Sequence, residues 1–304
     1  MKVDAVLITG PTASGKSAVA LDVAAAIGGA IVNTDSMQVY RQLRILTARP
    51  DDAEMARVPH HLFGHVGVEE RYSAGRYGRE AAETLADLRA RGRIPLFVGG
   101  TGLYFSVLTE GIAEIPPVPA AVAAAASAKL NEMGNAAFHA MVMACDPQTG
   151  ARLAPGDSQR LLRAYSVFQA TGRPLSDWQK GGAAPVLAGL KLARFVLNPP
   201  RPTLHARIAA RFAAMLAQGV VEEVRALPRP DPALPAARIL GLAAIRDFAD
   251  GRIGREAMEE TVVTATRQYA KRQVTWYRKK MAGWQWIESE VQRNIISEIM
   301  SQVA

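Results

Sequence analysis

The sequence is poor in two features whose scarcity narrows what the protein can be. It has a single cysteine, Cys145, which excludes an intramolecular disulfide and a multi-cysteine zinc site and fits a reducing compartment. No apolar run approaches the length of a membrane span, and the first four residues lead directly into a predicted strand, which leaves no signal peptide. We therefore expect a cytoplasmic protein that does not enter a membrane.

Acidic residues are scarce relative to basic ones. The 304 residues include 36 Lys and Arg against 28 Asp and Glu, which gives a formal net charge of +8. This balance suits a polyanionic partner, although net charge bears on association and not on fold. The length allows one large α/β domain, or one domain with an insertion, and the apolar fraction of 49% supplies a full core.

The most informative stretch reads Gly-Pro-Thr-Ala-Ser-Gly-Lys-Ser. The apolar run Val6–Ile8 precedes it and a helical pattern follows, which is the strand–loop–helix order of a phosphate-binding loop. Glycines let successive amide N–H groups converge on an anion, and the helix adds the positive end of its dipole. The lysine can reach the outer phosphates and the last serine can ligate Mg²⁺. The residues expected to bind a diphosphate or triphosphate group are Gly10, Pro11, Thr12, Ala13, Ser14, Gly15, Lys16 and Ser17. The alternative is an ordinary glycine-rich turn before a helix.

Two further stretches follow predicted buried strands. Asp35 comes shortly after Ala30–Asn33, and Thr101 lies among glycines just after Ile94–Val98. Because the carboxyl ends of parallel strands form the ligand crevice of an open sheet, we expect Asp35 and Thr101 to face the phosphate loop. Asp35 could bind magnesium, take a proton, or merely cap a turn. The glycines around Thr101 suggest close approach to a ligand, or a turn without one.

The order of elements predicts an α/β fold: a P-loop NTPase-like parallel sheet flanked by helices, with a helical insertion domain. A stiff Pro-rich segment at 115–119 precedes alanine-rich helical sequence without an obvious strand. The predicted division is a first part of the P-loop core domain at 1–112, the insertion domain at 113–185, and a second core part at 186–304 that includes a basic helix. After a strand at 190–197, the remainder from residue 202 is predicted to be helical, including a helix through 239–242.

The most cationic segment, 267–280, holds six cations, no acids and three aromatic residues in fourteen positions. On a helix, Arg267, Lys271 and Arg278 share one side and can follow a line of phosphates. The alternative is a solvated basic face whose aromatic side chains lie in the core.

Taken together, these stretches make the sequence resemble the bacterial form of the tRNA dimethylallyltransferase (isopentenyl-tRNA transferase) family. The matching stretches occur in family order from residue 8 to about residue 280. They are the phosphate loop, 35–40, 59–62, 99–104, 159–160, 211–216 and 265–276. The chain departs from the family pattern at Leu242, because many relatives carry tyrosine at that place after Arg-x-x-Gly.

The resemblance implies transfer of a dimethylallyl group from dimethylallyl diphosphate to the exocyclic amine of an adenosine adjacent to the anticodon of tRNA, with release of diphosphate. It implies that the phosphate loop holds the donor's diphosphate, that Mg²⁺ binds at Ser17, and that the adenosine is flipped out of its stack. By matching position, Asp35 is the general base on the amine, Thr101 orients the leaving diphosphate or the base, and Arg211 neutralises charge on the departing diphosphate.

The resemblance also implies that the insertion and the basic helix grip the anticodon stem-loop from two sides, in a chain expected to act as a monomer. The residues expected to contact tRNA are Asp35, Ser36, Met37, Gln38, Gln159, Arg160, Leu161, Leu162, Arg163, Arg238, Lys271, Arg272, Gln273, Trp276 and Arg278.

Two other functions remain as alternatives. A small-molecule kinase could use the same loop with Asp35 as the base for a hydroxyl, but the strand at 94–98 ends in glycines where a Walker-B strand carries an acid, and a kinase does not need the basic helix. An RNA-binding protein with an idle phosphate loop would leave the nearness of Asp35 and Thr101 to that loop unexplained.

Overall fold

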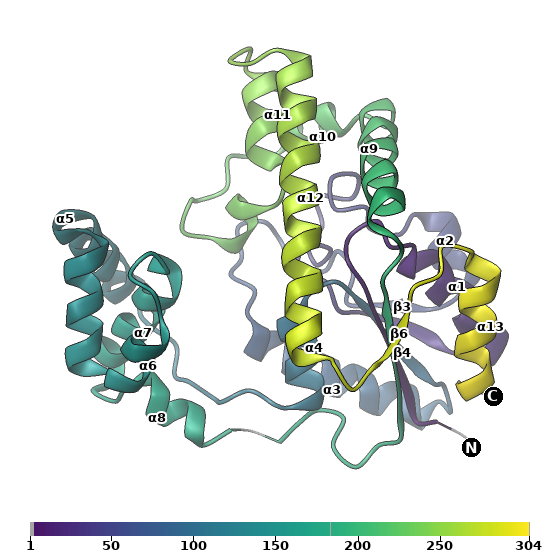
Figure 1. Cartoon of the computed structure of the whole chain (residues 1–304), viewed down its shortest axis with the longest axis horizontal. Coiled ribbons are helices and arrows are strands. Elements are labelled where there is room, and N and C mark those ends of the chain that lie inside the picture. The colour runs from purple at the N-terminus through teal and green to yellow at the C-terminus, as the bar shows by residue number, and fades with distance from the viewer. Residues whose placement is uncertain (1–2, 183, 304) are drawn as a thin grey trace. The chain divides into compact units, whose positions relative to one another are not determined.

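The computed structural model describes residues 3–182 and 184–303 (Figure 1). The chain divides into two compact units. The first, which we call the core unit, comprises Met1–Leu108 and Val186–Ala304, and the second, the helical unit, comprises Thr109–Pro185. The helical unit therefore begins four residues before the predicted start of the insertion at residue 113.

The core unit contains a six-stranded sheet in which all neighbouring strands run parallel. The strand order is β3-β2-β4-β1-β5-β6. The strands are β1 (Ala5–Thr9), β2 (Ala30–Asn33), β3 (His60–His61), β4 (Pro95–Gly99), β5 (Leu192–Leu197) and β6 (Gln285–Ile287). Every residue of β1, β2 and β4 is buried, as expected for a parallel sheet covered on both faces. The predicted parallel sheet is confirmed, and its order brings the carboxyl ends of β2, β4 and β1 side by side.

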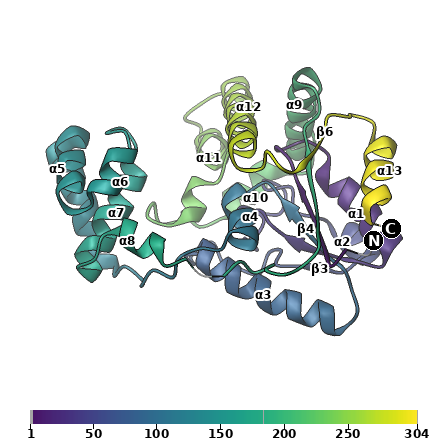
Figure 2. The ribbon, with the colours of Figure 1, turned by 60° about the horizontal axis from the view of Figure 1, so that its bottom comes forward.

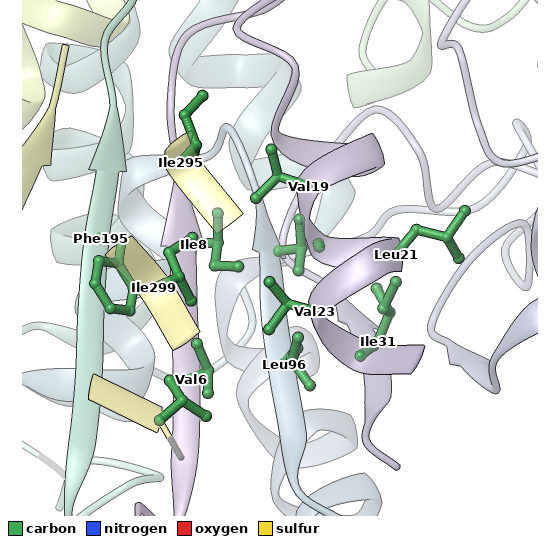
Figure 3. Packing of buried hydrophobic residues seen from close by; sticks show 14 of the residues in the cluster. Val6, Ile8, Val19, Leu21, Val23, Ile31, Leu96, Phe195, Ile295 and Ile299 are labelled. Atoms are coloured by element: carbon green, nitrogen blue, oxygen red, sulfur yellow. The ribbon is translucent and has the colours of Figure 1, made fainter. Parts of the chain in front are cut away.

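Helices flank this sheet (Figure 2). Those of the core unit are α1 (Lys16–Ile27), α2 (Asp52–Arg57), α3 (Ala74–Ala90), α4 (Gly102–Thr109), α9 (Arg201–Ala217), α10 (Val220–Ala226), the 3₁₀ helix η1 (Pro235–Arg238), α11 (Leu242–Ala249), α12 (Arg255–Lys280) and α13 (Gln292–Val303). A buried apolar cluster joins α1 and α13 to the sheet, with Val19 and Val23 of α1 and Ile299 of α13 against Ile8 of β1 (Figure 3). Burial of each such side chain stabilises the folded state by about 1.5–3 kcal/mol. This packing holds α1, and with it the helix start at Lys16, against the sheet.

The helical unit contains α5 (Ala120–Cys145), α6 (Pro147–Arg152), α7 (Ser158–Thr171) and α8 (Leu175–Lys180). It has its own apolar core, in which Phe138 and Val142 of α5 lie in one cluster with Leu161 of α7. The buried carboxylate of Asp146 accepts hydrogen bonds from the backbone N–H groups of Thr149 and Ser176, both at 3.0 Å. This carboxylate links the first turns of α6 and α8.

Two predictions for the second half of the core unit are wrong. The sequence predicts only helices after residue 202, but Gln285–Ile287 forms the edge strand β6 beside β5. The helix predicted through 239–242 is interrupted, because η1 ends at Arg238 and α11 begins at Leu242. Gly241 lies between them at φ +85°, a backbone conformation that favours glycine.

Across the described part of the chain, every helix is too short or too polar to cross a membrane.

Candidate active site

The phosphate loop connects β1, a central strand of the sheet, to the first turn of α1. Ala13 and Gly15 adopt left-handed φ values of +64° and +90°, which bend the backbone as anion-binding loops require. Gly10 allows a close approach to β5, because a Cβ there would lie 2.5 Å from the carbonyl oxygen of Leu197. The loop therefore presents amide groups and a helix N-terminus at the carboxyl edge of the sheet.

Lys16 is the cation of this loop. Its Nζ donates to the carbonyl oxygen of Pro11 at 3.4 Å, so the side chain folds back across the loop. Burial lowers the pKa of Lys16 to about 8, the Asp35 carboxylate opposes this shift, and Arg211 adds to it. The lysine thus shares one electrostatic environment with an acid and a second cation, and a bound anion would favour its charged form.

Asp35 lies just beyond β2 and is fixed by its neighbours. Its N–H donates to Asn33 Oδ1 at 2.8 Å, and its Oδ1 accepts the N–H of Met37 at 2.9 Å. Its other oxygen, Oδ2, lies near Gly100, where a Cβ would be 3.2 Å from it. The hydrogen bond to Oδ1 therefore orients the carboxylate, and Oδ2 lies beside the loop that follows β4.

Thr101 holds the segment that carries Asp35. Its Oγ1 accepts the N–H of Ser36 at 2.9 Å and donates to Ser36 Oγ at 3.1 Å. Its own N–H donates to the carbonyl oxygen of Thr34 at 3.2 Å. The structure therefore brings the predicted residues Asp35, Ser36 and Thr101 together, with Thr101 in contact with the loop after β2.

Arg211 reaches the phosphate loop from α9. Its Nη1 donates to Thr12 Oγ1 at 3.2 Å. Burial lowers its pKa, and Asp35 opposes that shift. Arg207, one turn earlier on α9, donates to the carbonyl oxygens of Ser14 at 3.3 Å and Glu290 at 3.0 Å. The sequence prediction missed Arg207 as a site residue, although its spacing from Arg211 places both on one helix face.

A cavity that is partly open to solvent has Asp35 and Arg211 in its wall. Its other lining side chains are mostly apolar and come from the loops after β1 and β2, from α9, from the loop before α11, and from α12. They are Thr12, Ala13, Met37, Leu46, Thr47, Ile208, Phe212, Met215, Leu240, Val262, Thr266 and Tyr269. Apolar walls with a few converging charged groups are typical of a small-molecule site.

A second cavity also reaches the phosphate loop. Lys16 and Ser17 line it together with Leu21, Ile31, Gln38, Pro50, Glu54, His60, Phe63, Val98 and Gly99. Met37 lines the first cavity and Gln38 the second. The segment after β2 therefore separates two spaces that both reach the phosphate loop.

This separating segment is held by a carboxylate that the sequence prediction missed. Glu223 of α10 accepts the backbone N–H groups of Ile45 at 2.7 Å and Leu46 at 2.8 Å. From the other side, Gln38 Nε2 donates to the carbonyl oxygens of Thr47 and Ala48. No local pattern could reveal Glu223, because it lies 178 positions from Ile45.

On α12 the expected RNA contacts separate into inward and outward side chains. Lys271, Arg272 and Arg278 are exposed. Gln273 is only 6% exposed, and both ends of its amide bind the protein itself, at Thr12 and Gly100. Trp276 packs over Gly102, so closely that a Cβ on that glycine would overlap the indole ring. The placement of Gln273 corrects the expectation that it contacts RNA, because its polar groups are already used inside the core unit.

The residues predicted on α7 also differ in exposure. Gln159, Arg160 and Arg163 are exposed, and Arg160 pairs with Asp157 at 3.2 Å. Leu162 is half-buried, but Leu161 is fully buried in the core of the helical unit. The structure therefore gives Leu161 a packing position in place of the expected RNA contact. In the core unit, Arg238 is exposed at the end of η1.

Comparisons with known proteins match almost the whole chain. A family model described as IPP transferase matches residues 38–280, and one described as Isopentenyl transferase matches residues 3–63. A tRNA dimethylallyltransferase of Phenylobacterium zucineum (strain HLK1) is 53% identical over 280 residues, which cover 91% of this chain and 90% of that protein. One of Nitrobacter hamburgensis is 48% identical over 289 residues, covering 94% and 91%.

Solved structures agree with these matches. The full-length tRNA isopentenylpyrophosphate transferase of Bacillus halodurans superimposes with a TM-score of 0.68 at 29% identity, over 99% of this chain and 97% of that one. A eukaryotic dimethylallyltransferase, crystallised while acting on tRNA, shares the fold with a TM-score of 0.79 at 23% identity, over 99% and 80%.

Proposed function

The chain belongs to the tRNA dimethylallyltransferase family, and we propose that it transfers a dimethylallyl group from dimethylallyl diphosphate to the exocyclic amine of an adenosine beside the anticodon. The resemblance found in the sequence is confirmed: the chain is a tRNA-modifying prenyltransferase with a P-loop NTPase-like α/β fold. One observation carries the finer proposal. Thr12 and Ala13 of the phosphate loop, the Asp35 carboxylate and the Arg211 guanidinium line one cavity, and Arg211 donates to the Thr12 hydroxyl.

We propose that the donor's diphosphate binds on the phosphate loop. Lys16 and Arg211 supply two cations there, and Arg211 is already bonded to the Thr12 hydroxyl. Strand β4 ends in Gly99 and is followed by glycine and threonine, where a phosphoryl-transfer enzyme of this class carries the Walker-B acid for its metal. A loop that holds a leaving diphosphate does not need that acid, because no γ-phosphoryl group is transferred.

Mg²⁺ fits the same loop. Ser17 is exposed in the first turn of α1 and lines the second cavity together with Lys16. A serine hydroxyl, diphosphate oxygens and water form the all-oxygen ligand set that Mg²⁺ takes in phosphate sites. Ser17 would hold the ion, and the ion would supply positive charge to the leaving diphosphate.

The chain's own residues account for the proton and the charge that the transfer moves. The amine nitrogen attacks C1 of the donor, the C1–O bond breaks, and diphosphate leaves with the electron pair. The nitrogen then loses a proton, which Asp35 accepts; a positioned base typically contributes about 10²–10⁴-fold. Lys16 and Arg211 face the charge that develops on the departing oxygen. Thr101 helps to position Asp35 for this step, because it forms two hydrogen bonds with Ser36, the next residue in the chain.

The first cavity suits a flat base and a short prenyl chain. Its walls include Phe212, Met215 and Val262, and Asp35 lies among them. An adenine stacked in an RNA loop cannot reach a carboxylate inside a cavity, so the nucleotide must be flipped out. Met37 lines this cavity beside Asp35, and we propose that Met37 and its neighbour Ser36 contact the nucleotide. Gln38 lines the second cavity and donates to Thr47 and Ala48, so its expected contact with RNA stays a prediction.

We propose that exposed polar and cationic side chains on each unit contact the rest of the RNA. On α12 these are Lys271, Arg272 and Arg278, and Arg238 lies exposed at the end of η1. The helical unit adds the exposed side chains of Gln159, Arg160 and Arg163, with the half-buried Leu162 beside them. Such side chains bind phosphates and make affinity depend on salt. We propose that a single chain binds one anticodon stem-loop.

The function is tested by incubating the protein with unmodified tRNA and labelled dimethylallyl diphosphate, then analysing the digested nucleosides by mass spectrometry. The proposal expects label in an adenosine beside the anticodon, only when Mg²⁺ is present, with one diphosphate released per label. A tRNA with guanosine at that position is the matched control and should stay unlabelled. Phosphate transfer from ATP to a metabolite would instead support a kinase, and RNA binding without label would support a binding protein.

A further inference from the structure

Gln273 lies on the inward face of α12, between the two loops that border the catalytic cleft. Its amide oxygen accepts the backbone N–H of Thr12 at 2.9 Å, and its amide nitrogen donates to the carbonyl oxygen of Gly100 at 2.9 Å. These partners lie 261 and 173 positions away in the chain. One planar amide therefore sets the separation between the phosphate loop and the loop that follows β4.

The surroundings of this amide leave little room for movement. A Cβ on Gly100 would overlap Gln273 Nε2 and lie 3.2 Å from Asp35 Oδ2, so the amide and the carboxylate flank the same glycine. The hydroxyl of Tyr277, one turn further along α12, donates to the same Gly100 carbonyl oxygen at 2.8 Å. With two donors on it, this carbonyl is held firmly against α12.

Thr12 is the residue through which Gln273 reaches the reacting groups. Its N–H donates a hydrogen bond to Gln273, and its hydroxyl oxygen accepts one from Arg211. Backbone N–H groups of a phosphate loop otherwise face the anion. Because Gln273 engages this one, it fixes the orientation of the Thr12 peptide and of the hydroxyl that meets the guanidinium.

From these contacts we infer that Gln273 is a positioning residue for the transfer reaction, which acts through Thr12 and Gly100 and not by touching RNA. It keeps the diphosphate site, with Arg211, at a fixed distance from the loop beside Asp35. The inference rests on the proposed function. It also divides α12 into an inner face that aligns the cleft and an exposed cationic surface that meets phosphates.

The test compares Gln273→Met, which keeps the length of the side chain and removes both hydrogen bonds, with Gln268→Met, the same change at an exposed position of α12. The probes are inorganic diphosphate with Mg²⁺, an anticodon stem-loop RNA, and the transfer assay. Gln273→Met should lower kcat and diphosphate affinity by about tenfold each, which is the loss expected for hydrogen bonds near a charged ligand. Its RNA affinity should equal that of the wild type, and Gln268→Met should leave the affinity for diphosphate unchanged.

A second variant, Gln273→Glu, gives a pH profile that loss of packing would not produce. A protonated glutamic acid can accept from Thr12 and donate to Gly100, as the amide does, whereas the carboxylate cannot donate. Burial raises the pKa of such a carboxyl group, so the ratio of variant to wild-type kcat should rise by about threefold from about pH 8 to about pH 6. Melting temperatures of all variants are measured to check that each variant is folded.

Two results would overturn the inference. One is a Gln273→Met variant whose kcat at saturating RNA and diphosphate affinity stay those of the wild type; if its RNA affinity fell at the same time, Gln273 would be an RNA contact. The other is a Gln273→Glu ratio that does not change with pH. Failure of the proposed function is distinguishable from both, because the wild type would then label no tRNA, while the diphosphate affinities of the two methionine variants could still be compared.

Discussion

The guanidinium of Arg211 donates a hydrogen bond to the hydroxyl of Thr12 over 3.2 Å, across 199 positions of sequence. This bond ties α9 to the phosphate loop. It also holds a cation close enough to Asp35 for the carboxylate to raise its pKa against the larger lowering by burial. A positive charge is thus fixed beside the anion site before any ligand arrives, which is the condition for electrostatic preorganisation.

Replacing this guanidinium should slow chemistry more than it weakens RNA binding. Arg211→Gln removes a preorganised cation facing the leaving diphosphate, so the single-turnover rate of label transfer should fall by about 10²–10³-fold. Arg211→Lys should recover only part of the rate, because an ammonium lacks the planar fork. Arg201→Gln, at the exposed start of the same helix, is the matched control. If Arg211→Gln transferred the group at the wild-type rate, Arg211 would not face the leaving group.

The lowered pKa of Lys16 predicts that diphosphate binding depends on pH. Below about 8 the side chain is an ammonium, and above about 8 it is increasingly neutral. Because bound diphosphate stabilises the ammonium, binding at higher pH must take up a proton, and affinity should fall by up to about tenfold per pH unit above that value. The measurement is calorimetric titration with inorganic diphosphate from about pH 7 to about pH 9.5, a range in which Lys16→Arg stays charged.

The Lys16→Arg variant corrects for ionisation of the ligand itself. The ratio of wild-type to variant affinity should decline as the pH rises through about 8. A ratio that is constant across this range would show that Lys16 remains charged in the free protein, and would contradict the lowering of its pKa by burial.

The exposed cations of α12 predict a salt effect. Lys271→Gln combined with Arg272→Gln should weaken binding of an anticodon stem-loop and flatten the plot of log affinity against log salt by about one unit per lost phosphate contact. Arg255→Gln, at the first residue of the same helix, is the control, because Arg255 pairs with Glu259 at 2.7 Å. An unchanged slope in the double variant would make these cations part of a solvated surface.

The parts of the site that the sequence predicts are either local or follow from topology. The phosphate loop is one continuous strand–loop–helix segment, so its residue order alone indicates its conformation. Asp35 and Thr101 can be predicted to approach it because they follow β2 and β4, and parallel strands bring their carboxyl ends to one edge.

The remaining parts depend on packing between distant segments, which local patterns do not encode. Glu223 and Gln273 form hydrogen bonds with residues more than 170 positions away in the chain, and the sequence around each of them does not indicate those partners. The sequence predicts RNA contacts for both Gln273 and Leu161, although each is buried, because a short polar or basic stretch does not show which of its positions face inward. Strand β6 has three residues, too few for a periodic pattern to predict it.

The single-turnover transfer rate of Asp35→Asn at saturating donor and tRNA tests directly whether Asp35 takes the proton. Asparagine keeps an oxygen that can accept the N–H of Met37, but it cannot take a proton from the adenosine amine. If the carboxylate beside the phosphate loop is the base, the rate falls by about 10²–10⁴-fold while tRNA affinity stays close to that of the wild type. Transfer at the wild-type rate would show that Asp35 is not the base, because the proton would then leave by another route.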